Sequence, residues 1–107
     1  MTLDDRSFAT LADRTLARIL DAVERGCDAA DAELRDGILT LELDEGGTFV
    51  VNKHGPNREI WLSSPRSGAW HFAWNGTVWA STRGPETLEA VLAADLAAAT
   101  GTEIDLG

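Results

Sequence analysis

Carboxylates are concentrated in one stretch of this 107-residue chain. Nine lie between positions 21 and 45, where only two arginines oppose them. Five of the nine are candidate metal ligands: Asp21, Glu24, Asp28, Asp31 and Glu33. The first three are separated by three and four residues, which predicts one row along a helix face and into the following loop. We call the five residues the acidic surface.

Carboxylate oxygens are the ligands that hard cations favour where thiolates and imidazoles are absent. A row on an exposed helix face and loop is not a preformed cage. We therefore expect modest affinity, several bound ions and poor selectivity among divalent metals. The alternative is that the row is simply solvated, as charged helix faces usually are.

The other side chains that could bind metal or react form no motif. Cys27 is the only cysteine, so it can form no internal disulfide, and a lone thiol is not a zinc site. Near a helix end, such a small residue is commonly structural. His54 and His71 are far apart in sequence and belong to no spaced ligand pair, so we interpret both as surface polar residues.

An enzyme is the less favoured class of function. The sequence contains no Ser-His-Asp set, no phosphate-binding glycine loop and no Glu-x-x-His pair. A weak metal-oxidising activity at the acidic surface is the form that an enzyme could take here, but it needs a site of fixed geometry.

Trp61 is a candidate contact residue for a protein partner. Side chains alternate along a strand, so if Ile60 and Leu62 face a core, Trp61 faces the opposite side with Glu59 and Ser63. A tryptophan on an uncovered sheet face is a common binding hot spot. The alternative is a core tryptophan, since this residue type is usually well buried.

The net charge of −9 is unevenly distributed. Residues 1–48 carry twelve acids and five arginines, whereas residues 49–107 carry six acids and four bases. Such a chain repels phosphate backbones, so we expect cations and basic proteins as partners rather than nucleic acid. No apolar stretch has membrane-spanning length, and the N-terminus has no targeting signal. We therefore expect a bacterial cytoplasmic protein, or else a processed form whose leader has been removed.

The elements that position these residues follow from the hydrophobic pattern. A period of three to four predicts a helix over residues 4–25, capped by Asp4 or Ser7. Gly84-Pro85-Glu86 is expected to open a final helix, with proline at its first position, that ends at Gly101. Alternation and turn residues predict two short strands within 32–43, and further strands at 48–52, 59–63, 70–74 and 77–81, with residues 53–57 as a loop.

This order of elements predicts the fold class α+β. A meander of five or six antiparallel strands has one apolar face that must be covered, and the N- and C-terminal helices can lie side by side on it. The expected architecture is a two-layer sandwich, and its length corresponds to a single domain over residues 1–107.

Residues 52–68, reading NKHGPNREIWLSSPRSG and followed by Trp70-His71-Phe72, resemble the central signature of the frataxin family. The resemblance includes the asparagine that ends a strand, the proline loop, the Ile-Trp-Leu-Ser-Ser-Pro strand and the glycine before the next strand. It extends to Phe8 and to the final helix, and so covers nearly the whole chain.

The resemblance implies a protein that binds iron weakly through surface carboxylates and docks on the cysteine desulfurase and scaffold of iron-sulfur cluster assembly. The residues implied for partner binding are Asn52, Glu59, Trp61 and His71. Asn52 and Trp61 match the family pattern directly, whereas Glu59 and His71, together with His54, depart from its common residues. The implied state without metal is a monomer. Iron storage with ferroxidase-like activity and a metal-independent interaction module are the alternatives.

Overall fold

A computed structural model describes residues 4–106 of the chain. The elements, in order, are α1 (Asp5–Gly26), β1 (Ala30–Arg35), β2 (Ile38–Leu43), β3 (Thr48–His54), β4 (Glu59–Ser64), β5 (Gly68–Trp74), β6 (Trp79–Ser81) and α2 (Leu88–Thr100). The predicted order of helix, meander and helix is therefore confirmed.

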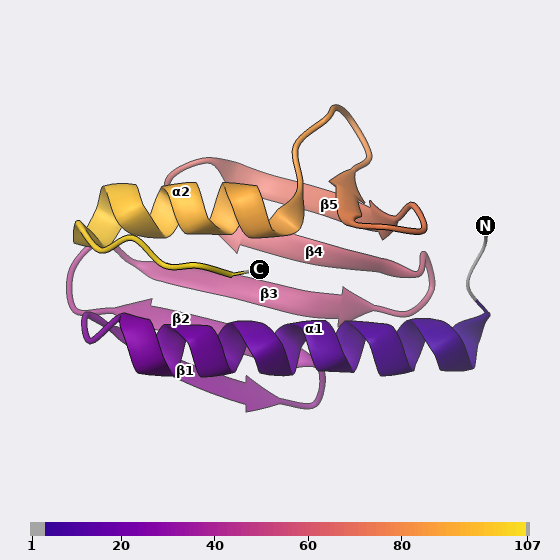
Figure 1. Cartoon of the computed structure of the whole chain (residues 1–107), viewed down its shortest axis with the longest axis horizontal. Coiled ribbons are helices and arrows are strands. Elements are labelled where there is room, and N and C mark those ends of the chain that lie inside the picture. Colours follow the sequence, from indigo (N-terminus) through magenta and orange to yellow (C-terminus); the bar gives the residue numbers. More distant parts are fainter. Residues whose placement is uncertain (1–3, 107) are drawn as a thin grey trace.

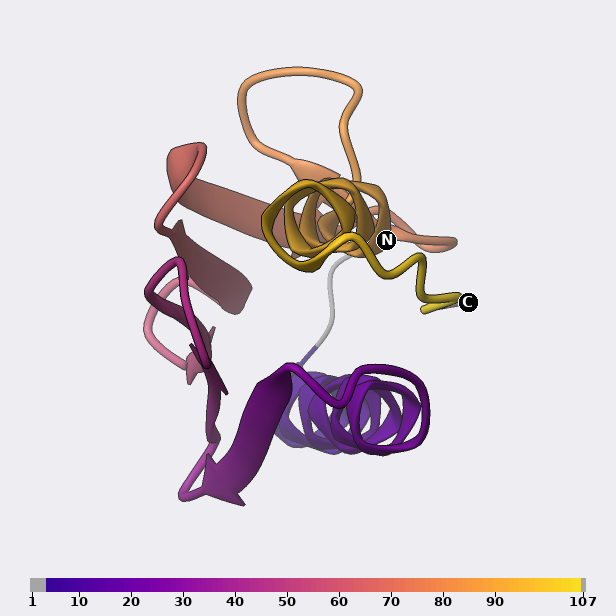
Figure 2. The same ribbon diagram turned by 90° about the vertical axis from the view of Figure 1, so that its left-hand side faces the viewer.

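The six strands form one antiparallel sheet in which every strand pairs with its neighbours in sequence. Both helices lie on one face of this sheet (Figure 1), and the end-on view shows the opposite face uncovered (Figure 2). We call the uncovered side the open face. The predicted two-layer α+β sandwich with six strands is confirmed.

Helix α1 begins at Asp5, and Asp4 is its N-cap, one of the two predicted caps: the Asp4 side chain accepts a hydrogen bond of 2.7 Å from the Ser7 amide. This hydrogen bond holds the pKa of the Asp4 carboxyl below its usual value. The apolar stripe faces the sheet, so that Phe8, Leu16 and Ile19 are buried. The helix ends at Gly26, one residue beyond the prediction.

One hydrophobic core lies between the two layers. The sheet contributes Leu39, Leu41, Phe49, Val51, Ile60, Leu62 and Phe72. Trp79 is also buried there, and its indole nitrogen donates a hydrogen bond of 2.9 Å to the Thr15 hydroxyl of α1. Because this polar atom is satisfied, the ring adds apolar contact area without a desolvation penalty.

Strand β3 is longer than predicted. Lys53 and His54, expected in a loop, pair with Ile60 and Glu59 of β4. The turn occupies only residues 55–58, and the Arg58 amide donates to the Gly55 carbonyl. The proline at position 56 therefore lies inside a β-turn, where its missing N–H does not interrupt the ladder.

The last strand and the last helix both start later than predicted. Asn75 accepts hydrogen bonds from the amides of Thr77 and Val78, so the turn extends to residue 78 and β6 begins at Trp79. The expected helix start at residues 84–86 is wrong. Thr87 is the N-cap of α2 because the backbone just before it is used elsewhere: the Ser81 amide donates to the Glu86 carbonyl.

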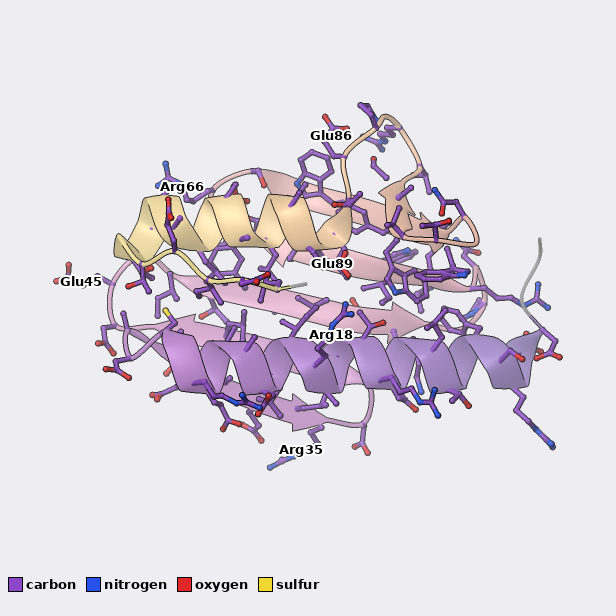
Figure 3. All side chains as sticks on the ribbon, viewed as in Figure 1. Arg18, Arg35, Glu45, Arg66, Glu86 and Glu89 are labelled. Carbon is purple, nitrogen blue, oxygen red and sulfur yellow. The ribbon has the colours of Figure 1, made fainter. Side chains whose placement is uncertain are left out.

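The two helices are also joined across their interface. Arg18 of α1 and Glu89 of α2 form an ion pair of 2.7 Å, and Figure 3 shows the two side chains facing each other between the helices. Helix α2 stops at Gly101, which takes the left-handed conformation with φ 76°, as the sequence predicts. Within residues 4–106, neither helix combines the length and the apolar character needed to cross a membrane.

Candidate functional site

The acidic surface wraps around the β1 edge of the molecule. Asp21 and Glu24 lie on the last turns of α1, Asp28 lies in the following loop, and Asp31 and Glu33 point from β1 to the open face. All five carboxylates are exposed, as predicted. The structure therefore distributes them over two layers instead of gathering them around one point.

Two of the five are partly neutralised by arginines. The Arg25 guanidinium binds Asp21 one helical turn away, and Arg35 binds Glu33 at 2.7 Å. Asp31 lies directly opposite Glu42 of β2, a cross-strand pair of like charges. Among residues 4–106, no three His, Cys, Asp or Glu side chains are close enough together to hold one metal ion. Any cation bound here would be held by few ligands and by water.

A second cluster crosses the centre of the open face. Asn52 of β3 is directly opposite Trp61 of β4, and Trp61 is directly opposite His71 of β5. Ile60 and Leu62 are buried against the helices, which confirms the predicted parity of this strand. Three of the four residues predicted for partner binding thus form one row across three strands.

Trp61 is clamped between two imidazoles. Its ring stacks on His54 with centroids 3.6 Å apart and on His71 with centroids 4.2 Å apart, with interplanar angles of 12° and 6°. Its indole nitrogen donates a hydrogen bond of 2.8 Å to Glu59. We call His54, Trp61, His71 and Glu59 the aromatic stack. These contacts fix the indole and leave it half-buried, less exposed than the sequence suggests.

His54 is the member of the stack that sequence reasoning missed. The extra pairing of β3 brings it beside Trp61, although it is far from His71 in the chain. Its Nδ1 atom is buried and has no hydrogen-bond partner among the described residues. The Nδ1 atom of His71 lies 3.8 Å from the Glu59 carboxylate. The stack therefore has hydrogen-bonding capacity that the fold itself does not fully use.

Ile38 is a further residue on the open face that the sequence did not single out. It lies opposite Asn52 and is 46% exposed, the one large hydrophobic side chain in residues 4–106 with such exposure. On the far side of Asn52 from Trp61, it adds an apolar contact point for a partner. Cys27, by contrast, is buried in the core, as a structural cysteine is expected to be.

Residues 1–102 match the family described as the frataxin-like domain. The two-layer fold and this match together show that the chain belongs to the frataxin family. Within the family it is of the bacterial CyaY type: it is 38% identical over 94 residues to the "Iron-sulfur cluster assembly protein CyaY" of Ralstonia nicotianae, covering 84% of this chain and 82% of that protein. It is 42% identical over 83 residues to the protein of the same name from Dechloromonas aromatica, covering 76% and 77% of the two chains.

Solved structures agree with this assignment. Frataxin from Psychromonas ingrahamii superposes with a TM-score of 0.90 over 98% of this chain and 99% of its own, and its 22% identity supports the fold alone. A trimeric frataxin from the yeast Saccharomyces cerevisiae, complexed with ferrous iron, has a TM-score of 0.72 and 31% identity over 94% of this chain and 89% of its own.

Proposed function

We propose that this protein acts in iron-sulfur cluster assembly, as an iron-binding adaptor that docks on the cysteine desulfurase and the scaffold protein. The relatives of the CyaY type carry the assembly role in their names. The proposal rests mainly on one arrangement: part of the acidic surface shares the open face of the sheet with the aromatic stack. Asp31 and Glu33 point to the same open face as Asn52, Trp61 and His71.

The two surfaces supply different parts of an interaction. Exposed carboxylates act over a Debye length and steer a basic partner or a cation toward the β1 edge. The aromatic stack acts only in contact, because its energy comes from area removed from water and from stacking. A partner that covers the open face can therefore be drawn to the acidic side and held at the aromatic centre.

Iron binding, in this proposal, takes place at the acidic surface. Glu24, Asp28 and Asp31 have no ion-pair partner among residues 4–106, so they are the carboxylates most available to a cation. Oxygen ligands suit ferrous and ferric iron, and the scattered positions favour weak binding in which water completes the coordination.

The ion pairs within the acidic surface favour a second candidate function. Asp21 and Glu33 are already bound to arginines, which lowers the number of carboxylates that a metal can use. The same pattern of paired and unpaired charges suits a metal-independent module that contacts a basic protein surface. In that case the docking described above holds and iron has no part in it.

An iron titration with and without a bacterial cysteine desulfurase separates the two candidates. We expect a paramagnetic divalent ion to broaden the amide signals around the acidic surface, and the desulfurase to capture the protein in a pull-down. Broadening centred on His54 and His71 would place the metal elsewhere. Capture by the desulfurase without any metal binding would leave only the interaction module, and failure of capture would contradict the adaptor role.

A further inference from the structure

The outer edge of β5 is only partly paired. Strand β6 pairs with Phe72, Ala73 and Trp74, so the edge beside residues 68–71 has no strand next to it among the described residues. The His71 carbonyl points outward here, because it accepts a hydrogen bond of 3.0 Å from Thr82. Since backbone groups two residues apart point to the same side of an antiparallel strand, the N–H and C=O of Ala69 also point outward.

A groove runs along this edge. One part, about 400 Å³ in volume, is lined by Ser67, Ala69, Trp70, His71, Ser81, Arg83 and Glu86. A second part, about 280 Å³ in volume, shares three of these residues and continues under the start of α2, where its walls are Trp70, Ala90, Val91 and Ala94. The loop between β6 and α2 arches away from the sheet and carries Glu86, labelled in Figure 3, so it forms the outer wall (Figure 1). We call both parts together the edge groove.

The walls of the edge groove are held in place by the fold. Trp70, the floor, donates its indole N–H to the Ser67 hydroxyl at 2.9 Å, and that hydroxyl is in turn bound to Asp95 of α2. The outer loop is tied back by the Ser81 amide, which donates to the Glu86 carbonyl at 2.7 Å. A groove with fixed walls loses little conformational entropy when it is filled.

We propose that the edge groove binds an extended peptide segment of a partner protein, which adds as a strand beside β5. The outward N–H and C=O of Ala69 supply the ladder hydrogen bonds of such a strand. One side chain of the segment turns toward the helix layer and meets Trp70 and Val91, so an apolar residue fits there. The proposal is separate from the acidic surface and does not depend on iron.

Arg83 lines the edge groove together with the carboxylates Glu86 and Asp95, so an acidic residue of the segment has to lie on the Arg83 side. Within residues 4–106 no carboxylate forms an ion pair with the Arg83 guanidinium. An acidic residue next to the apolar one would pair with it.

The probe is the acetylated and amidated peptide TVDLDVT, titrated into the whole 15N-labelled protein. We expect saturable shifts of the Ala69 and Trp70 amides and slower hydrogen exchange of the Ala69 amide, the signature of an added strand. Arg83→Glu should weaken binding by about tenfold, the scale of one reversed surface charge pair, and should shift the preference to the peptide TVKLKVT.

Arg66→Glu is the matched control, because it makes the same charge change on the neighbouring β4–β5 loop outside the edge groove. Ala69→Pro removes the outward N–H and should also weaken binding. If the Ala69→Pro protein does not fold, Arg83→Glu still tests the proposal. The proposal is overturned by equal weakening in Arg83→Glu and Arg66→Glu, by shifts centred on other residues, by unchanged exchange of the Ala69 amide, or by no saturable binding. Self-association that the peptide does not displace overturns it as well.

Discussion

The acidic surface and the aromatic stack are built in opposite ways. The carboxylates are spread over α1, a loop and β1, and where they have partners these are exposed arginines. Trp61 is held on both ring faces and at its nitrogen by residues of three strands. The acidic surface is therefore specified by charge and tolerates rearrangement, whereas the aromatic stack is specified by packing and depends on each contact.

The largest expected effect is on the aromatic stack. Trp61→Ala should speed dissociation from the desulfurase and scaffold complex by about 30-fold, which corresponds to roughly 2 kcal/mol, the scale of an interface hot spot. The fold should remain, because Trp61 lies on the open face. Ser63→Ala, on the same strand and face, is the control. Surface plasmon resonance measures the rates, and equal dissociation rates for the two variants would contradict the assigned role.

The next effect concerns the stability of the folded state. Neutralising Glu24, Asp28 and Asp31 together, as Gln, Asn and Asn, should raise the free energy of unfolding by about 1 kcal/mol, because each like-charge pair contributes a few tenths. Asp21→Asn should bring no gain, since it also removes the ion pair with Arg25. Urea denaturation measures both. A triple variant no more stable than the natural sequence would show that the repulsion between these carboxylates is fully screened by solvent and salt.

A smaller effect is expected on association. Glu24→Lys should slow binding to the desulfurase by roughly threefold at low salt and should flatten its salt dependence, because a steering charge is reversed. Glu86→Lys makes the same charge change near the opposite edge of the sheet and should have less influence. Stopped-flow rates at two salt concentrations test this. An identical loss in both variants would mean that net charge alone, and not the acidic surface, governs the encounter.

The smallest effect is on the acid dependence of stability, and it concerns Asp4. Unlike the carboxylates of the acidic surface, Asp4 accepts a hydrogen bond from a backbone amide of its own helix. The depressed pKa of Asp4 means that its stabilising contribution is complete above the unfolded-state value of 3.8 and is lost as pH falls through the lower folded-state value. Asp4→Asn keeps an N-cap and should remove this part of the acid dependence. Thermal melts between pH 2 and 5 measure it, and identical pH profiles for both proteins would contradict the depressed pKa of Asp4 in the folded state.

The sequence predicted best what depends on neighbouring residues. Alternation around Ile60 and Leu62 indicated the side on which Trp61 lies, because an apolar strand face must be buried. The exposure of the acidic surface followed from its spacing in the same way. Both features are decided within a few residues of the chain.

Features that depend on pairing between distant segments were not predictable. His54 reaches Trp61 only because β3 continues past Asn52, and this depends on a four-residue turn that accommodates Pro56. The predicted start of α2 was wrong because the sequence offers two start signals, Pro85 and the N-cap Thr87. The helix starts after Thr87, because the Glu86 carbonyl already accepts a hydrogen bond from the Ser81 amide at the end of β6. The aromatic stack needed the register of three strands, which no local pattern contains.

The buried hydrogen bond between Trp79 and Thr15 has a consequence for synthesis on the ribosome. It joins α1 to the last strand across 64 positions of the chain, so the apolar stripe of α1 stays incompletely covered until residue 79 has emerged. We expect the nascent chain to hold an open helix and partial sheet until residue 79 has emerged, and to close into the native domain only after that.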